Sequence, residues 1–147
     1  MSAKLTQRIL RDLTRERLSL LFCRVMTFFA VQGAYVALTY VFAGPGIGPD
    51  SFLVGFRLDP IHAVVHFALG VAGASVGFLR PALAVLFTRF FAVFYLTLAF
   101  FGTFTAIHFG MRLGLSENSL HWSLGALTAL IGFLPVLPSR EVNQVKA

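Results

Sequence analysis

The second half of this chain repeats the first, which restricts the fold to two similar units joined in tandem. Nine identical positions recur 55 residues apart without a gap. They are Gly55, Arg57, Leu58, His66, Leu69, Gly70, Ala74, Gly77 and Phe78, which return as Gly110, Arg112, Leu113, His121, Leu124, Gly125, Ala129, Gly132 and Phe133. Upstream, Phe28-Phe29-Ala30-Val31 returns as Phe90-Phe91-Ala92-Val93. We therefore expect the two units to pack alike and His66 and His121 to occupy equivalent positions.

The composition indicates a membrane protein. The chain is 57% hydrophobic and 12% charged, whereas soluble proteins carry roughly 25% charged residues. The sequence predicts four apolar spans, at residues 20–43, 60–79, 82–108 and 118–137, and a transmembrane helix needs about 20 residues. Because the spans are continuously apolar rather than alternating, they are predicted to be helices and not barrel strands.

The distribution of positive charge predicts the orientation of the chain. A net charge of +6 is compatible with nucleic-acid binding, but the charges lie at span ends and at the termini. Only Arg57 and Arg112 fall on the opposite side from the other ten basic residues, which are Lys4, Arg8, Arg11, Arg15, Arg17, Arg24, Arg80, Arg89, Arg140 and Lys146. By the positive-inside rule, both termini are predicted to be cytoplasmic, and no nucleic-acid partner is expected.

These features predict an all-α four-transmembrane-helix bundle. Residues 1–19 form an amphipathic cytoplasmic helix that lies in the membrane interface against anionic lipids or docks on a protein. Residues 20–137 form the transmembrane domain, with one repeat at about 20–79 and the other at about 82–137. Residues 138–147 form a cytoplasmic tail. Each repeat has an even number of spans, so both insert in the same direction as parallel repeats.

A stripe of small residues follows each repeated histidine. On a helix, Gly70, Ala74 and Gly77 lie within 80° of His66. The second repeat carries the same stripe as Gly125, Ala129 and Gly132. Small residues one turn apart allow helix backbones to approach closely in lipid. The two stripes are expected to pack either on each other or each on a partner helix of its own.

If the stripes face each other, four side chains converge near the outer membrane surface. They are His62, His66, Glu117 and His121, and His108 at the expected end of the third span lies at a similar depth. Three imidazoles and a carboxylate are suitable ligands for zinc or another divalent transition metal. The alternatives are a polar latch, in which these groups hydrogen-bond across helices, and simple contact with headgroups and water.

A tetrapyrrole, haem or chlorophyll, is a second candidate cofactor. Membrane tetrapyrroles use neutral histidine nitrogens, and a glycine four residues after each of His66 and His121 leaves a flat surface for a ring. The chain's 17 phenylalanines are able to line such a pocket. The small-residue stripe argues against it, because a haem between two histidines forces their helices apart.

The segment Glu117-Asn118-Ser119-Leu120-His121, followed by Leu124-Gly125, resembles a bacterial family of four-helix membrane proteins catalogued as a domain of unknown function. Its mark is Asn-x-x-His opening the last helix, with a related histidine on the second helix. The first repeat departs from it, since Ala63 stands where the second has Asn118. The resemblance implies the topology and no reaction.

No catalytic set is evident, so we expect a protein that is not an enzyme, in the bacterial inner (cytoplasmic) membrane. The leading hypothesis is an accessory or assembly subunit of a larger membrane complex, whose partners are the lipid bilayer and either other subunits or further copies of itself. The alternatives are a metal- or tetrapyrrole-binding membrane protein and a small oligomeric transporter.

Overall fold

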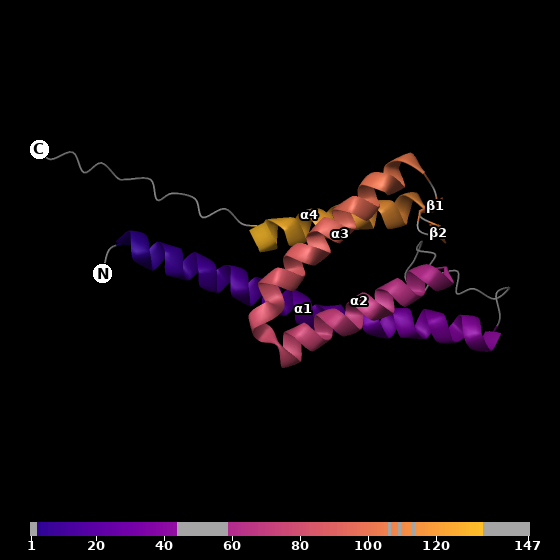
Figure 1. Ribbon diagram of the computed structural model, residues 1–147, viewed down its shortest axis with the longest axis horizontal. Coiled ribbons are helices and arrows are strands. Elements are labelled where there is room, and N and C mark those ends of the chain that lie inside the picture. The colour runs from indigo at the N-terminus through magenta and orange to yellow at the C-terminus, as the bar shows by residue number, and fades with distance from the viewer. Residues whose placement is uncertain (1–2, 44–58, 106, 109, 113, 134–147) are drawn as a thin grey trace, which may run out of the picture.

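The computed structural model describes residues 3–43, 59–105, 107–108, 110–112 and 114–133, and these are almost all helical (Figure 1). In chain order the elements are α1 (Ala3–Ala43), α2 (Pro60–Leu79), the short 3-10 helix η1 (Pro81–Leu83), α3 (Ala84–Phe104), β1 (Ile107–His108), β2 (Met111–Arg112) and α4 (Leu115–Phe133). The expected bundle of four helices is confirmed.

The helices are arranged as two hairpins. Helix α2 packs along the second half of α1, and α4 packs along α3 (Figure 1). The start of α1, the junction between α2 and α3, and the end of α4 lie at one end of the bundle, which we call the basic end. The strands and the start of α2 lie at the other end. The order agrees with the tandem repeat predicted from the sequence.

Local sequence signals define the turn between the hairpins. Helix α2 begins at Pro60, where a missing N–H costs little, and the Asp59 carboxylate accepts a hydrogen bond of 2.9 Å from the backbone N–H of His62. Helix α2 ends at Leu79, because the helical conformation is disfavoured for Arg80, the residue that precedes Pro81. Helix η1 then reverses the chain direction into α3.

The third helix is shorter than predicted. It ends at Phe104 rather than 108, with Thr105 extended at φ −138° and ψ 144°. Strands β1 and β2 pair antiparallel, with Ile107 opposite Arg112, and Gly110 in the intervening turn adopts φ +78°, a value that favours glycine. The prediction that His108 ends the third helix is therefore wrong, because the chain leaves the helix to form this hairpin.

The exterior of the bundle is apolar and its interior contains polar groups. Val41 and Phe42 are 75% and 84% exposed, and many other large apolar side chains face outward. The buried polar side chains are Ser19, Gln32, His62, His66, Thr88, Glu117, Asn118, His121 and Thr128. A soluble monomer rarely exposes so much contiguous apolar surface, so this distribution fits lipid as the surrounding solvent.

Three described helical segments are long and apolar enough to cross a membrane: Asp12–Phe42, Pro60–Leu79 and Pro81–Phe104. The described part of α4 has 19 residues and opens with the polar Ser116, Glu117 and Asn118. The predicted fourth span ends at residue 137, outside the described residues, so its crossing stays a prediction. The segments 44–58 and 138–147 also lie outside them.

The first helix is unbroken over its 41 residues. The predicted amphipathic helix of residues 1–19 therefore continues into the first span with no break at residue 20. Its Leu13 and Leu18 side chains are exposed.

An aromatic core joins the two hairpins. Met26, Phe91 and Tyr95 are fully buried, and Phe22, Phe29, Leu69, Phe87, Phe94 and Leu124 pack around them. The rings of Phe91 and Tyr95 stack with centroids 3.9 Å apart. Because α1 and α3 both contribute to this core, it fixes the hairpins against each other beneath the histidines described next.

Candidate functional site

Three histidines from the two hairpins meet inside the bundle. His62 and His66 on α2 and His121 on α4 are 2%, 4% and 2% exposed. One ring nitrogen from each lies within 4.8 Å of the other two. The ring centroid of His62 is 4.6 Å from that of His66 and 5.5 Å from that of His121. The structure thus brings together three of the four side chains that the sequence grouped.

The small-residue stripes do not face each other. The backbone of α1 at Phe29 and Ala30 fills the space beside Gly70, and Leu96 of α3 fills the space beside Gly125. Each stripe packs on its own partner helix, which was the second of the two expected arrangements. The histidines still converge, because His66 lies 40° around the helix from Gly70 and so points toward the bundle centre.

Gln32 of α1 orients one histidine. The amide is buried, and its Oε1 lies 3.2 Å from Nδ1 of His66. An amide oxygen only accepts, so Nδ1 carries the hydrogen and Nε2 of the neutral ring keeps its lone pair. Sequence reasoning missed Gln32, although a glutamine inside an apolar span is itself a signal.

Several imidazole nitrogens in the cluster are buried without a hydrogen-bond partner among the described residues. They are both ring nitrogens of His62 and Nε2 of His66. Buried polar atoms are nearly always hydrogen-bonded in native proteins, and each exception costs about 1–3 kcal/mol. The polar latch expected from the sequence did not include Gln32, and the His66–Gln32 contact leaves both nitrogens of His62 without a partner among the described residues.

Tyr95 lies beside the cluster from α3. Its ring meets that of His121 edge to face, with centroids 5.0 Å apart. Its buried hydroxyl has no hydrogen-bond partner among the described residues. Sequence reasoning missed this tyrosine, because nothing in span three distinguishes it from the surrounding phenylalanines.

Glu117 is buried, but it does not join the group of three histidines. Its Oε2 accepts a hydrogen bond of 3.1 Å from the Ser116 hydroxyl. A Cβ atom added at Gly114 would overlap the same carboxylate oxygen. The side chain is therefore turned toward the first residues of α4, and its predicted role as a metal ligand would require it to rotate away from them.

Asn118 connects α4 to the end of α3. In the amide orientation that gives both its nitrogen and its oxygen a partner, Nδ2 donates to the Ala99 carbonyl (3.2 Å) and Oδ1 accepts from the Thr103 N–H (3.3 Å). A Cβ at Gly102 would overlap this amide. The Asn-x-x-His spacing thus has a physical meaning: Asn118 fixes the start of α4 against α3, and His121 points toward the centre.

A matched pair of arginines holds the opposite end of each hairpin. Nε of Arg24 donates to the Gly77 carbonyl (3.3 Å), and its guanidinium lies 5.6 Å from the centroid of Phe78. Nε of Arg89 donates to the Gly132 carbonyl (2.8 Å), and its guanidinium lies 5.3 Å from the centroid of Phe133. We call these two arrangements the arginine clasps.

Sequence reasoning did not find the clasps. The match between Phe28-Phe29-Ala30-Val31 and Phe90-Phe91-Ala92-Val93 pairs Arg24 with Leu86. The structure instead gives Arg24 and Arg89 the same partners. In their packing, Arg24 of α1 is therefore equivalent to Arg89 of α3, whereas the sequence match makes it equivalent to Leu86.

Residues 16–134 match the model of a family described as a domain of unknown function, DUF4383. The chain belongs to this family. Its predicted membership of such a family is confirmed. No curated protein and no solved structure matches the chain. The matched range of this DUF4383 chain includes the three histidines, Gln32 and both arginine clasps.

Proposed function

We propose that this multi-pass membrane protein binds a divalent transition-metal ion through His62, His66 and His121. The observation that supports the proposal is the closeness of the three buried imidazoles, combined with unpartnered nitrogens on His62 and His66. A bound cation would give one nitrogen of His62 and Nε2 of His66 the partner that the described protein groups do not supply.

The donor set limits the choice of ion. Neutral imidazoles suit Zn²⁺, Cu²⁺, Ni²⁺ and iron, whereas Mg²⁺ and Ca²⁺ require oxygen ligands. Zinc–nitrogen bonds of about 2.0–2.1 Å place tetrahedral ligand atoms roughly 3.4 Å apart. The nitrogens, which lie within 4.8 Å of one another, would have to approach slightly, and rotation of the side chains is sufficient for that.

The surroundings supply the rest of a metal site. Gln32 holds His66 through Nδ1, which leaves Nε2 as the ligand atom, and such outer contacts fix ligand orientation in known metal sites. The fourth position is available to water or to the Glu117 carboxylate. Glu117 would also offset one of the two positive charges of the ion, which lowers the cost of placing it in an apolar bundle.

The geometry favours an ion over a tetrapyrrole. The flat surface that the sequence suggested beside Gly70 is filled by the backbone of α1 at Ala30. His62 lies against His66, with centroids 4.6 Å apart. A porphyrin on His66 would need both of these neighbours to move. The accessory-subunit and oligomeric-transporter hypotheses stay predictions from composition, since no contact among the described residues favours them.

Cobalt(II) titration of the purified full chain in detergent tests the metal site. Tetrahedral Co²⁺ gives strong visible absorption, and the single Trp122, next to His121, gives a fluorescence readout by quenching. We expect one Co²⁺ per chain, displaced by Zn²⁺, and elemental analysis of the untreated protein to show a transition metal. Gln32→Leu is expected to weaken binding about 10–100-fold.

His121→Gln separates the metal site from a polar latch, because glutamine hydrogen-bonds across helices but is a poor transition-metal ligand. We expect it to abolish the Co²⁺ absorption while the helical circular dichroism is kept. Thr97→Val, an exposed position on α3 whose hydroxyl bonds only to the Val93 carbonyl, is the control and should bind as the wild type does. Unchanged Co²⁺ binding by His121→Gln would overturn the proposal.

A further inference from the structure

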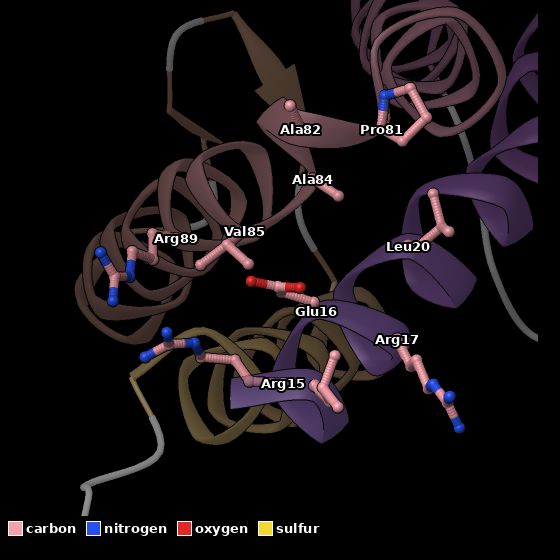
Figure 2. A pocket seen from close by; sticks show the side chains of 10 residues that line it. Arg15, Glu16, Arg17, Leu20, Pro81, Ala82, Ala84, Val85 and Arg89 are labelled. Carbon is pink, nitrogen blue, oxygen red and sulfur yellow. The ribbon is translucent and has the colours of Figure 1, made fainter. Parts of the chain in front are cut away.

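A second candidate site lies at the basic end, in a cavity of about 600 Å³ between α1 and the start of α3 (Figure 2). It is independent of the histidine cluster and of the function proposed for it. The residues that line it are Leu13, Arg15, Glu16, Arg17, Leu20, Pro81, Ala82, Ala84, Val85 and Arg89. Three arginines and one glutamate among apolar side chains give it both a positive charge and an apolar surface.

Arg89 reaches this pocket with its guanidinium already positioned. Its clasp uses Nε, which bonds to the Gly132 carbonyl, and the ring face of Phe133. No described residue accepts a hydrogen bond from its two terminal nitrogens. The fork geometry of a guanidinium matches the oxygens of a phosphate, and a fixed fork loses little side-chain entropy when it binds one.

Arg15 supplies a second cation. Its Nη2 pairs with Asp12 at 3.1 Å, whereas its Nε is buried without a hydrogen-bond partner among the described residues. Figure 2 shows the guanidinium groups of Arg15 and Arg89 on the same side of the pocket, with Arg17 pointing away. A buried donor in a pocket that the fixed Arg89 also lines requires an acceptor, and an anion in the pocket would supply it.

The apolar lining residues and the position of the pocket along the helices favour a phospholipid over a free anion. Leu13, Leu20 and Val85 offer hydrocarbon contact, and the pocket lies at the ends of the candidate spans Asp12–Phe42 and Pro81–Phe104. The headgroups of a bilayer lie at the ends of such spans. We propose that this pocket binds one anionic phospholipid, with its phosphate at Arg15 and Arg89 and an acyl chain over the apolar residues.

The first hairpin provides a matched control. Arg24 has the same clasp on Gly77 and Phe78, but it does not line the pocket. Substituting Arg24 therefore removes the same charge and a similar helix contact without touching the proposed site. Arg15→Gln complements Arg89→Gln, since Arg15 makes no clasp and its loss should leave the hairpins paired.

Native mass spectrometry of the full chain, titrated with phosphatidylglycerol or phosphatidylcholine, tests the proposal. We expect selective retention of phosphatidylglycerol, a loss of affinity of about fivefold for Arg15→Gln and for Arg89→Gln, no change for Arg24→Gln, and tighter binding for Glu16→Gln. Helical circular dichroism shows whether each variant folds, and these readouts do not depend on any metal.

Three results would overturn the proposal. Equal retention of phosphatidylcholine would mean that the cavity is an apolar groove without headgroup recognition. Displacement of the lipid by millimolar inorganic phosphate would indicate a site for free anions. An equal loss of affinity in Arg24→Gln, Arg15→Gln and Arg89→Gln would show that total charge, and not this pocket, retains the lipid.

Discussion

The two hairpins of this bundle are alike at the basic end and different at the histidine end. Both helix pairs are joined near the basic end by an arginine on a glycine carbonyl, covered by the following phenylalanine. At the other end, the first hairpin uses Gln32 on His66, whereas the second uses Asn118 on the last turn of α3. The two repeats therefore share the arginine contact that joins their helices at the basic end, but they use different polar side chains at the histidine end.

The closeness of the helices also differs. In the first hairpin, Cβ atoms added at Gly33 and Gly70 would overlap backbone atoms of the partner helix. At Gly102 in the second hairpin, the nearest atoms belong to the Asn118 side chain, and at Gly125 they are the Leu96 side chain at 2.9 Å and the Leu96 backbone nitrogen at 3.0 Å. At Gly33 and Gly70 the first hairpin is therefore a closer backbone-to-backbone contact than the second, which places the Asn118 and Leu96 side chains beside its glycines.

Glycine substitutions should produce the largest difference between the hairpins. Gly70→Ala is expected to lower the free energy of unfolding by about 3 kcal/mol or more, the upper range for overpacking, because backbone must move. Gly125→Ala should cost less, about 1–2 kcal/mol, since the Leu96 side chain can move and its backbone nitrogen, at 3.0 Å from the added Cβ, needs to shift only slightly. Unfolding titrations in mixed micelles, followed by circular dichroism, measure both. Equal losses would mean that the hairpins are equally tight.

Gly102→Ala should be rescued by a second substitution. The added methyl displaces the Asn118 amide, so the single variant loses about 1–2 kcal/mol. In the Asn118→Ala background the same change should cost less, with a coupling of about 1 kcal/mol in a double-mutant cycle. Additive losses would show that Asn118 does not occupy the space at Gly102.

Leucine substitutions of the two α2 histidines should differ in metal-free protein. His66→Leu leaves the Gln32 amide buried and unsatisfied, which costs about 1–3 kcal/mol, and Gln32→Leu in the same chain should recover most of it. His62→Leu removes two unpartnered nitrogens and should be neutral or stabilising. A clear loss of stability in His62→Leu without metal would mean that His62 has a structural partner.

The arginine clasps should be equivalent. Arg24→Gln and Arg89→Gln each remove one hydrogen bond to a carbonyl and one cation–π contact, so each is expected to lower stability by about 1 kcal/mol. The same unfolding titration applies. A difference between the two stability losses larger than the experimental error would show that the two clasps, although alike in geometry, contribute unequally to the free energy of unfolding.

The smallest effect is expected at Tyr95. Removing its unpartnered hydroxyl in Tyr95→Phe should leave stability unchanged or slightly raised, because no hydrogen bond among the described residues is lost and the stacking on Phe91 is kept. Phe91→Ala, by contrast, should cost about 3–5 kcal/mol. A loss above about 1 kcal/mol in Tyr95→Phe would reveal a partner for the hydroxyl, such as bound water.

The features of the fold that could be predicted are those that leave a periodic pattern or a repeated motif in the sequence. Four helices and their pairing in two hairpins follow from the repeat and from helical spacing. The meeting of His62, His66 and His121 was expected only if the two small-residue stripes faced each other, and the structure brings the histidines together although each stripe packs on its own partner helix. The role of Glu117 as a fourth ligand stays a prediction, because its rotamer depends on the Ser116 hydroxyl and the space at Gly114, which helical spacing does not specify. Gln32 was missed although a glutamine inside an apolar span is itself a signal, whereas nothing in the third span distinguishes Tyr95 from the neighbouring phenylalanines. The strands at residues 107–112 are too short to produce any period.

The unbroken first helix makes the two proposed sites parts of one rigid rod. Arg15 and Leu20 line the basic pocket, and Gln32 bonds to His66, all on α1. At 1.5 Å per residue, Arg15 and Gln32 are about 25 Å apart along the axis. A helix without a hinge transmits its own rotation and sliding over that length. Whatever repositions α1 at the pocket therefore also repositions the amide that orients the histidine.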